Sequence, residues 1–338
     1  MKLPVIAGID VSRETSLRAR IDSLAKPPGS LGRMEDLAVR LGLIGAKDLD
    51  RALLLIFAGD HGLTEDGVSR YPASVTALMV ETFLAGRASA NAFARTVGCE
   101  VRVVDAGVAA DLPEHPALIA AKVRKGTRNA AGESALTTAE TEDALEKGIT
   151  LARDADHGLL VLGEMGIGNT ASAALLMHRL TGAPLEQSVG RGAGHDDAGF
   201  ARKQAVLARA AARSPVVAPF DVLREFGGLE IAMMAGAMLG GAAAGKVVIV
   251  DGFISTAAAL VAVRLDPAAM PYMVFSHRSA EAGHRLMLQA LGARPLLDLE
   301  MRLGEGTGAL LAIPLVRAAA RMLTDIASLD DVLQGKIT

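Results

Sequence analysis

Glycines alternate with other residues in the stretch LGEGTG, residues 303–308 near the end of the chain. This spacing lets a backbone approach a ligand closely and is typical of loops that bind phosphate. The carboxylate of Glu305 stands in the middle, however, and its charge would repel a bound phosphate. Partial burial would raise the pKa of this carboxyl and suit it to act as a general base beside an anion site. The alternative is that Glu305 caps the helix that follows.

A second glycine-rich turn, GEMGIGNT at residues 163–170, follows an apolar run and opens a helical pattern. Backbone N–H groups at such a helix start, helped by the helix dipole, bind anions well. The turn lacks the Gly-Lys-Ser/Thr of a P-loop and the glycine spacing of a dinucleotide fingerprint. We therefore predict that it binds a lone phosphate. The alternative is a tight turn with ordinary capping by Asn169 or Thr170.

Other polar residues could assist at either turn. Lys203 would supply a counter-charge to a phosphate, although its position alone favours a solvated helix residue. Ser279 ends the segment SHRS and offers a hydroxyl at another strand end. Asp60 and His61 could form a catalytic pair, but neighbours in a strand point opposite ways. The alternative is that Asp60 structures its loop.

Two more segments bear on the kind of ligand. The loop GVSRYP at residues 67–72 is polar with one aromatic side chain, which suits the lining of a pocket for a flat molecule. His277 and His284 are seven residues apart and could share a helix face. Because no third ligand follows at metal spacing, no metal site is predicted.

Apolar runs alternate with helical patterns along most of the chain. Continuous apolar runs are typical of strands buried on both faces. The rhythm predicts an α/β fold, a doubly wound and mainly parallel sheet of about six strands. Polar residues such as Glu164, Asp251 and Glu305 follow the ends of the runs, at the sheet edge where ligands bind in such folds. The runs cover residues 52–62, 100–108, 159–169, 246–253, 272–279 and 295–308.

The composition argues against nucleic-acid and membrane partners. The net charge is −3, aromatic residues make up 3% of the chain and tryptophan is absent, so few groups could hold or stack on a nucleic acid. Residues 231–250 are long enough to span a membrane, but glycines and Lys246 interrupt them, so we expect a buried helix and strand. The apolar run at the N-terminus is too short for a signal peptide. With one cysteine, Cys99, no intrachain disulfide can form, and we expect a cytoplasmic protein.

The first 50 residues lie outside the rhythm of strands and predict helices broken at KPPGS, residues 26–30. We expect residues 1–50 and 305–338 to form a small helical domain. Residues 51–304 would then form a large Rossmann-like domain that carries the active site.

Long stretches of the chain closely resemble the nicotinate-nucleotide:dimethylbenzimidazole phosphoribosyltransferase family. The resemblance runs in family order from about residue 20 to residue 325. The matching stretches are KPPGSLGRMEDLA, FAGDHGLTEDGVSRYP, KVRKGTRN, GEMGIGNTASAA, GRGAGHDDAGFARK, EFGGLEIAMMAGAMLG, VVIVDGFISTAA, FSHRSAEAGH and RLGEGTGALLA.

The resemblance implies a reaction in cobalamin lower-ligand synthesis. The ribose 5-phosphate of nicotinate mononucleotide passes to a benzimidazole nitrogen with inversion at C1′, giving nicotinate and α-ribazole 5′-phosphate. It also implies a homodimer without a metal or organic cofactor. A nicotinamide-dependent oxidoreductase would need a dinucleotide fingerprint, which is absent. Glu305 and Lys203 argue against a non-catalytic nucleotide-binding protein.

Carried over by position, the resemblance implies that Glu305 is the general base, which takes the N–H proton of the benzimidazole as the other ring nitrogen attacks. Leu78 departs from the family pattern, because a glutamine that can hydrogen-bond the acceptor often stands there. Either the preferred acceptor differs, or Leu78 faces the core. The implied phosphoribosyl site comprises Glu164, Gly166, Ile167, Gly168, Asn169, Lys203 and Ser279. The implied base site comprises Ser69, Tyr71, Leu78, Met165 and Leu303.

Overall fold

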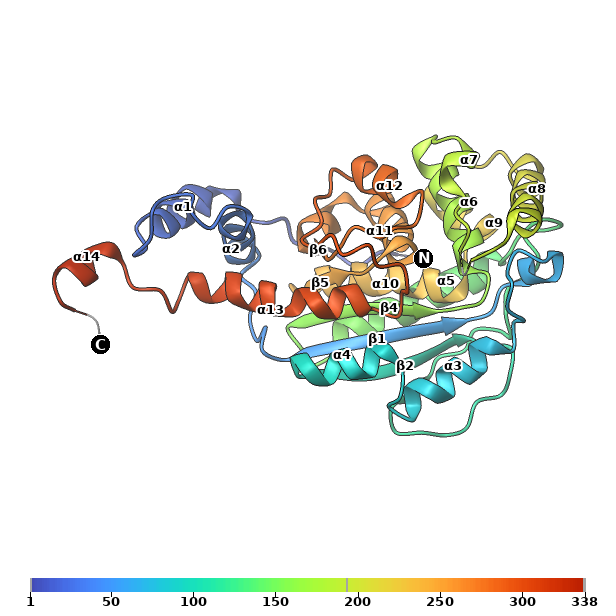
Figure 1. Cartoon of the computed structure of the whole chain (residues 1–338), viewed down its shortest axis with the longest axis horizontal. Helices are drawn as coiled ribbons and strands as arrows, with labels where there is room; N and C mark the ends of the chain where they lie inside the picture. The colour runs from blue at the N-terminus through green and yellow to red at the C-terminus, as the bar shows by residue number, and fades with distance from the viewer. Residues whose placement is uncertain (1, 193, 337–338) are drawn as a thin grey trace.

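The computed structural model describes residues 2–192 and 194–336. Within these residues the strands form one all-parallel, six-stranded sheet in the order β3-β2-β1-β4-β5-β6 (Figure 1). The predicted α/β fold with a parallel sheet is thus confirmed. The strands are β1 Ala52–Gly59, β2 Cys99–Gly107, β3 Leu118–Ala120, β4 Leu159–Met165, β5 Val247–Val250 and β6 Met273–Phe275.

Helices cover both faces of the sheet, because successive strand residues point to opposite sides. In β1, Leu53, Leu55 and Phe57 pack on one side, while Leu54 and Ile56 pack on the other. The first side is covered by α5 Thr138–Asp154, α6 Asn169–Thr181, α8 Asp197–Arg213, α9 Pro219–Phe226, α10 Leu229–Ala243, α11 Phe253–Leu265 and α12 His284–Ala290. The second is covered by α2 Arg33–Ile44, α3 Val75–Leu84, α4 Ser89–Val97 and α13 Thr307–Met322.

The direction of winding reverses between β1 and β4. The chain leaves β1 through α3 and α4 on one face of the sheet, and it reaches β4 through α5 on the other. β1 and β4 are nevertheless direct neighbours in the sheet. Such a reversal opens a crevice at the carboxyl ends of the two strands, which is where ligands bind in doubly wound folds.

The predicted strand at residues 295–308 is wrong, and the sixth strand is the short edge strand β3. The segment pairs with the end of β6 only briefly, through a parallel bridge between His277 and Leu297. The left-handed backbone of Glu300, at φ 56°, then turns the chain away from the strand direction. The other five predicted runs each contain a strand.

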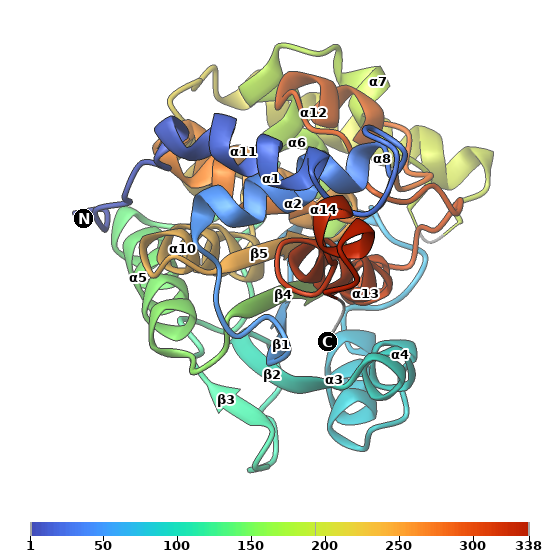
Figure 2. The same cartoon turned by 90° about the vertical axis from the view of Figure 1, so that its left-hand side faces the viewer.

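The helices near the two chain ends lie together. Figures 1 and 2 show α1 Glu14–Asp22 and α2 beside α13 and the short α14 Leu329–Leu333, projecting beyond the sheet. Leu24 forms an isolated bridge with Ser328, which joins the segment after α1 to the start of α14. In the described part of the chain, no helix combines the length and apolar character needed to cross a membrane. As expected, residues 231–250 supply most of the buried helix α10 and all of β5. The short helix α7 Leu185–Ser188 completes the set of α-helices in the described residues.

Candidate active site

A cavity of about 610 Å³ opens at the carboxyl edge of the sheet. Its walls come from the ends of β4, β5 and β6 and from the turns that lead into α6 and α13. The candidate base Glu305 lies in the wall. So does the whole predicted phosphoribosyl set: Glu164, residues 166–169, Lys203 and Ser279. Of the predicted base set, Ser69, Tyr71, Met165 and Leu303 line it.

The turn around Glu305, which we call the acceptor-side turn (residues 304–306), has an unusual backbone. Gly304, Glu305 and Gly306 all have left-handed φ values, of 86°, 62° and 81°. A Cβ atom at Gly304 would collide with Glu164 Oε1, so only glycine fits there. A Cβ at Gly163, on β4, would lie 2.6 Å from the carbonyl group of Glu305. The turn is therefore pressed directly against the end of the central strand.

The Glu305 carboxyl is nearly buried, with 6% of the residue exposed. The pKa of this carboxyl is raised, mainly by burial. A hydrogen bond from the backbone N–H of Ala90 lowers the pKa, and the charge of Asp251 raises it. Its Oε2 has no hydrogen-bond partner in the described part of the chain. The carboxyl does not cap α13, because the N-terminal N–H groups of Gly306 and Ala309 donate to Asp251 instead. The arrangement suits proton uptake better than helix capping.

The second turn, which we call the phosphate-side turn (residues 166–168), leads into α6. Gly168, at φ 94°, precedes the helix and provides no side-chain cap. The start of α6 lines the cavity, as an anion site at a helix N-terminus requires. Asn169 does not cap its own helix, because its side-chain amide donates to Glu164.

Lys203 is fully buried, so its interpretation as a solvated helix residue is wrong. Its Nζ lies 2.9 Å from Thr170 Oγ1, in the first turn of α6. Burial lowers the pKa of the ammonium to about 8, against a raising influence from the nearby Glu281 carboxyl. A buried cation at a helix start, beside a hydroxyl, is suited to hold a phosphate.

Glu164 lies between the two turns. Its carboxyl accepts hydrogen bonds from the Asn169 side chain and from the backbone N–H of Glu305. Burial, followed by the charges of Asp251 and Glu230, raises its pKa to about 8. The carboxyl is therefore mostly protonated near neutral pH without ligand, and it can donate a hydrogen bond to a ligand oxygen.

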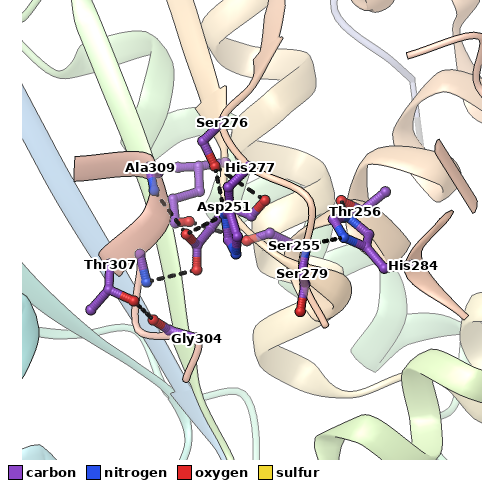
Figure 3. A network of polar contacts seen from close by, with 12 residues as sticks. Asp251, Ser255, Thr256, Ser276, His277, Ser279, His284, Gly304, Thr307 and Ala309 are labelled. Atoms are coloured by element: carbon purple, nitrogen blue, oxygen red, sulfur yellow. Dashed lines mark hydrogen bonds and ion pairs between the residues drawn. The ribbon is translucent and has the colours of Figure 1, made fainter. Parts of the chain in front are cut away.

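Ser279 is fixed through a neutral histidine. Its backbone N–H donates to His284 Nδ1 at 2.7 Å, and His284 Nε2 lies 2.9 Å from Thr256 Oγ1 (Figure 3). Burial lowers the pKa of His284 to about 3, so the ring stays neutral and Nδ1 remains an acceptor. His277 and His284 do not share a helix face, because α12 begins only at His284. No group of metal-ligating side chains exists among the described residues.

Asp60 and His61 have separate partners. Asp60 accepts the N–H of Ala109, so it does structure the neighbouring loop. His61 lies 2.7 Å from Glu230 Oε1 and 3.1 Å from Ser172 Oγ, in a fully buried cluster behind the phosphate-side turn. Burial lowers the pKa of His61, but the Glu230 carboxylate outweighs it and the net shift is upward. Sequence reasoning missed Glu230, although a carboxylate inside the apolar helix α10 was a signal.

Leu78 is 58% exposed and does not face the core, so that alternative is wrong. It is also not among the described residues that line the cavity. The wall contributed by α3 is apolar and comes from Val75 and Met79. Leu78 therefore lies outside the cavity wall, next in the chain to the lining residue Met79.

Comparisons with known proteins agree along nearly the whole chain. A family model described as "Phosphoribosyltransferase" matches residues 6–332. The nicotinate-nucleotide–dimethylbenzimidazole phosphoribosyltransferase of Cupriavidus necator is 51% identical, with 97% of each chain covered. The protein of that name from Ralstonia nicotianae is 52% identical, covering 96% of this chain and 94% of the relative. The crystal structure of CobT from Thermus thermophilus superimposes with a TM-score of 0.91, at 45% identity, covering 95% and 98% of the two chains.

Proposed function

The chain belongs to the nicotinate-nucleotide–dimethylbenzimidazole phosphoribosyltransferase family, and we propose that Glu305 is the general base of its reaction. The enzyme transfers the phosphoribosyl group of nicotinate mononucleotide to dimethylbenzimidazole, in the synthesis of the cobalamin lower ligand. The observation that carries the proposal is the buried carboxyl of Glu305 in the wall of the cavity that also holds Lys203 and the start of α6.

The reaction breaks one bond and forms one at C1′ of the ribose. One benzimidazole nitrogen attacks C1′, and the bond to the nicotinate nitrogen breaks, leaving its electron pair on that nitrogen. The pyridinium thus departs as a neutral ring and needs no acid. The second benzimidazole nitrogen loses its proton to Glu305. The raised pKa of this carboxyl supports the role, because a base is most effective when its pKa lies near the working pH.

The phosphate of the mononucleotide is held by Lys203, Ser279 and the start of α6, residues 166–169. Their support is position: all line one end of the same cavity, with the Lys203 ammonium against the first turn of the helix. Glu164 would bind the ribose, for which its protonated carboxyl offers a donor. Holding both substrates in line contributes much of the remaining rate enhancement.

The acceptor base lies between Ser69, Tyr71, Met165 and Leu303, and Leu78 is next in the chain to Met79, which also lines the cavity. These groups supply mainly apolar surface and an aromatic ring, which suits a flat heterocycle. Since a leucine at position 78 offers no hydrogen bond, shape and the contact with Glu305 would select the acceptor.

An assay of products tests the function. The purified protein is incubated with nicotinate mononucleotide and with dimethylbenzimidazole, benzimidazole, adenine or a cresol, and products are separated by HPLC. We expect α-ribazole 5′-phosphate and nicotinate with dimethylbenzimidazole. Product with another acceptor alone would change the assigned base, and absence of product with all of them would contradict the proposed activity.

We further propose a cytoplasmic homodimer in which residues 1–50 and 305–338 form a small helical domain that packs on the sheet through α2 and α13. The terminal helices project beyond the sheet (Figure 1), and the short α14 exposes Leu329, Val332 and Leu333 together, which supports burial against a second copy. The lone Cys99 supports a reducing compartment, because the chain needs no disulfide. Sedimentation analysis would show a single-chain mass if the dimer proposal is wrong.

A further inference from the structure

The helix that follows Glu305 takes its N-terminal cap from another part of the chain. The first N–H groups of an α-helix need acceptors that the helix itself lacks. For α13, the residue at the cap position is Gly306, which has no side chain to offer. Asp251, directly after β5, supplies both acceptors: Oδ2 lies 3.1 Å from the Gly306 nitrogen and Oδ1 lies 2.8 Å from the Ala309 nitrogen (Figure 3).

The acceptor-side turn needs such support because its backbone is strained. A non-glycine residue in the left-handed region costs about 1–2 kcal/mol, and it persists only where its surroundings enforce it. Glu305 is in that region. The turn is held on its N-terminal side by Glu164, which accepts the Glu305 N–H, and on its C-terminal side by Asp251. The hydroxyl of Thr307 closes it by donating to the Gly304 carbonyl at 2.7 Å.

His277 lies beside Asp251 and the start of α13. Its Nδ1 lies 3.7 Å from Asp251 Oδ1 and 3.1 Å from Ser276 Oγ, and both ring and carboxylate are buried (Figure 3). The ring also packs against the first turn of α13, because a Cβ atom at Gly308 would collide with Nδ1. The carboxylate of Asp251 is thus fixed between an imidazole and a helix start.

We propose that Asp251 is the positioning residue for the general base, and that His277 orients Asp251 for this role. The proposal rests on the proposed function of Glu305. Asp251 acts in two ways: it fixes the turn that carries Glu305 through its hydrogen bonds with Gly306 and Ala309, and when ionised it raises the pKa of Glu305. Burial also raises the pKa of the Asp251 carboxyl itself. The titratable groups that face this pair are Glu164 at the end of β4 and His277 after β6.

The test replaces Asp251 by asparagine, which keeps the shape but removes the charge and one acceptor. We expect Asp251→Asn to lower kcat about tenfold or more while the KM for nicotinate mononucleotide stays within about twofold. The acidic limb of the pH profile of kcat should move to lower pH, because Glu305 loses the charge that raises its pKa. Mere loss of packing would not move that limb.

A double-mutant cycle separates this proposal from the proposed function. If Asp251 acts through Glu305, the substitution should have little further effect in a Glu305→Gln background. A fully additive loss there, or an unchanged kcat and pH limb in the single variant, would overturn the positioning role. Activity retained by Glu305→Gln alone would instead overturn the general base.

Two further variants control for general effects of changing a buried aspartate and for failure of Asp251→Asn to fold. Asp105→Asn is the matched control, because this buried aspartate also lies near the end of a strand, β2, and also accepts a backbone N–H, that of Val108. We expect this variant to leave kcat unchanged. If Asp251→Asn does not fold, His277→Leu decides, since leucine removes the ring nitrogen Nδ1 that lies beside Asp251. A lower kcat at unchanged KM, lost in the Glu305→Gln background, supports the proposal; an unchanged kcat overturns it.

Discussion

The acceptor-side turn and the phosphate-side turn are alike in backbone and opposite in chemistry. Each leads from the carboxyl edge of the sheet into a buried helix, and each relies on left-handed glycines. The first carries a carboxyl, Glu305, toward the cavity, whereas the second turns a helix start toward it, with Lys203 alongside. Glycine spacing thus predicts that the backbone approaches a ligand closely, whereas the neighbouring side chains determine whether the turn suits an anionic group of that ligand.

The turns also differ in how they are supported. Asp251 accepts hydrogen bonds from the backbone at the acceptor-side turn. Behind the phosphate-side turn, Glu230 is bonded to His61 through one oxygen, and its other oxygen has no partner among the described residues. The turn itself is held by one hydrogen bond to a neutral side chain, from the Ile167 N–H to Thr76 Oγ1 at 3.1 Å, and by close packing of Gly166 against the Gly59 carbonyl. The acceptor-side turn is thus fixed through the acidic side chain of Asp251, and the phosphate-side turn through a neutral hydroxyl and close packing.

The largest expected effect separates proton transfer from binding. Glu305→Gln should lower kcat by about 10²-fold or more, because the amide cannot accept the benzimidazole proton. Binding of nicotinate mononucleotide, measured by calorimetry, should be retained, since that ligand belongs to the other turn. Unchanged turnover would show that the acceptor-side turn holds no base.

Loss of the buried cation should affect the phosphate-side turn alone. Lys203→Ala should raise the KM for nicotinate mononucleotide about tenfold or more, because a hydrogen bond to a charged group is worth about 1.5–3 kcal/mol. The KM for the acceptor should change little. Arg202→Ala, on the exposed neighbour in α8, serves as the control. Equal affinity in wild type and variant would move the phosphate elsewhere.

The pH dependence of the reaction also tests the proposed role of Lys203. In its proposed role Lys203 would bind phosphate as an ammonium ion, which is present below its pKa of about 8 and is lost as the pH rises through that value. We therefore expect kcat/KM for the mononucleotide to fall above about pH 8, by up to tenfold per pH unit. In Lys203→Ala the descending limb should become shallower, because only Glu164, whose pKa is also about 8, would still titrate there. A limb of unchanged steepness would show that Lys203 does not titrate in this range.

The smallest effect is expected at Leu78. Leu78→Gln should change the ratio of kcat/KM between dimethylbenzimidazole and the other acceptors a few-fold, about the value of one exposed hydrogen bond. Competition between two acceptors, read by HPLC, measures this ratio directly. An identical preference profile would show that position 78 does not contact the acceptor.

Local patterns were enough to locate the two turns and five strands. Glycine spacing indicates the backbone geometry of a turn, and a continuous apolar run indicates a strand that is buried on both faces. Both signals depend only on residues that are close together in the sequence. The edge strand β3 was missed because three residues carry no periodicity. Residues 295–308 were misread because their apolar start lies beside β6 without continuing as a strand.

The surroundings of the candidate site depend on contacts between distant residues, which the sequence does not reveal. The burial of Lys203 had a weak signal, since it shares a helix stripe with Val206 and Leu207. The pairing of His61 with Glu230 joins residues 169 positions apart. The role of Asp251 as the cap of α13 likewise appears only when β5 and the helix are adjacent.

At position 305 the left-handed backbone favours glycine for stability, whereas the proposed activity needs the glutamate side chain. Glycine would adopt the same conformation without the steric cost, which is about 1–2 kcal/mol for a residue with a side chain. The same change would remove the carboxyl that we propose as the general base. Selection for heat resistance alone would therefore favour losing catalysis here, so any search for more stable variants must score turnover as well as melting temperature.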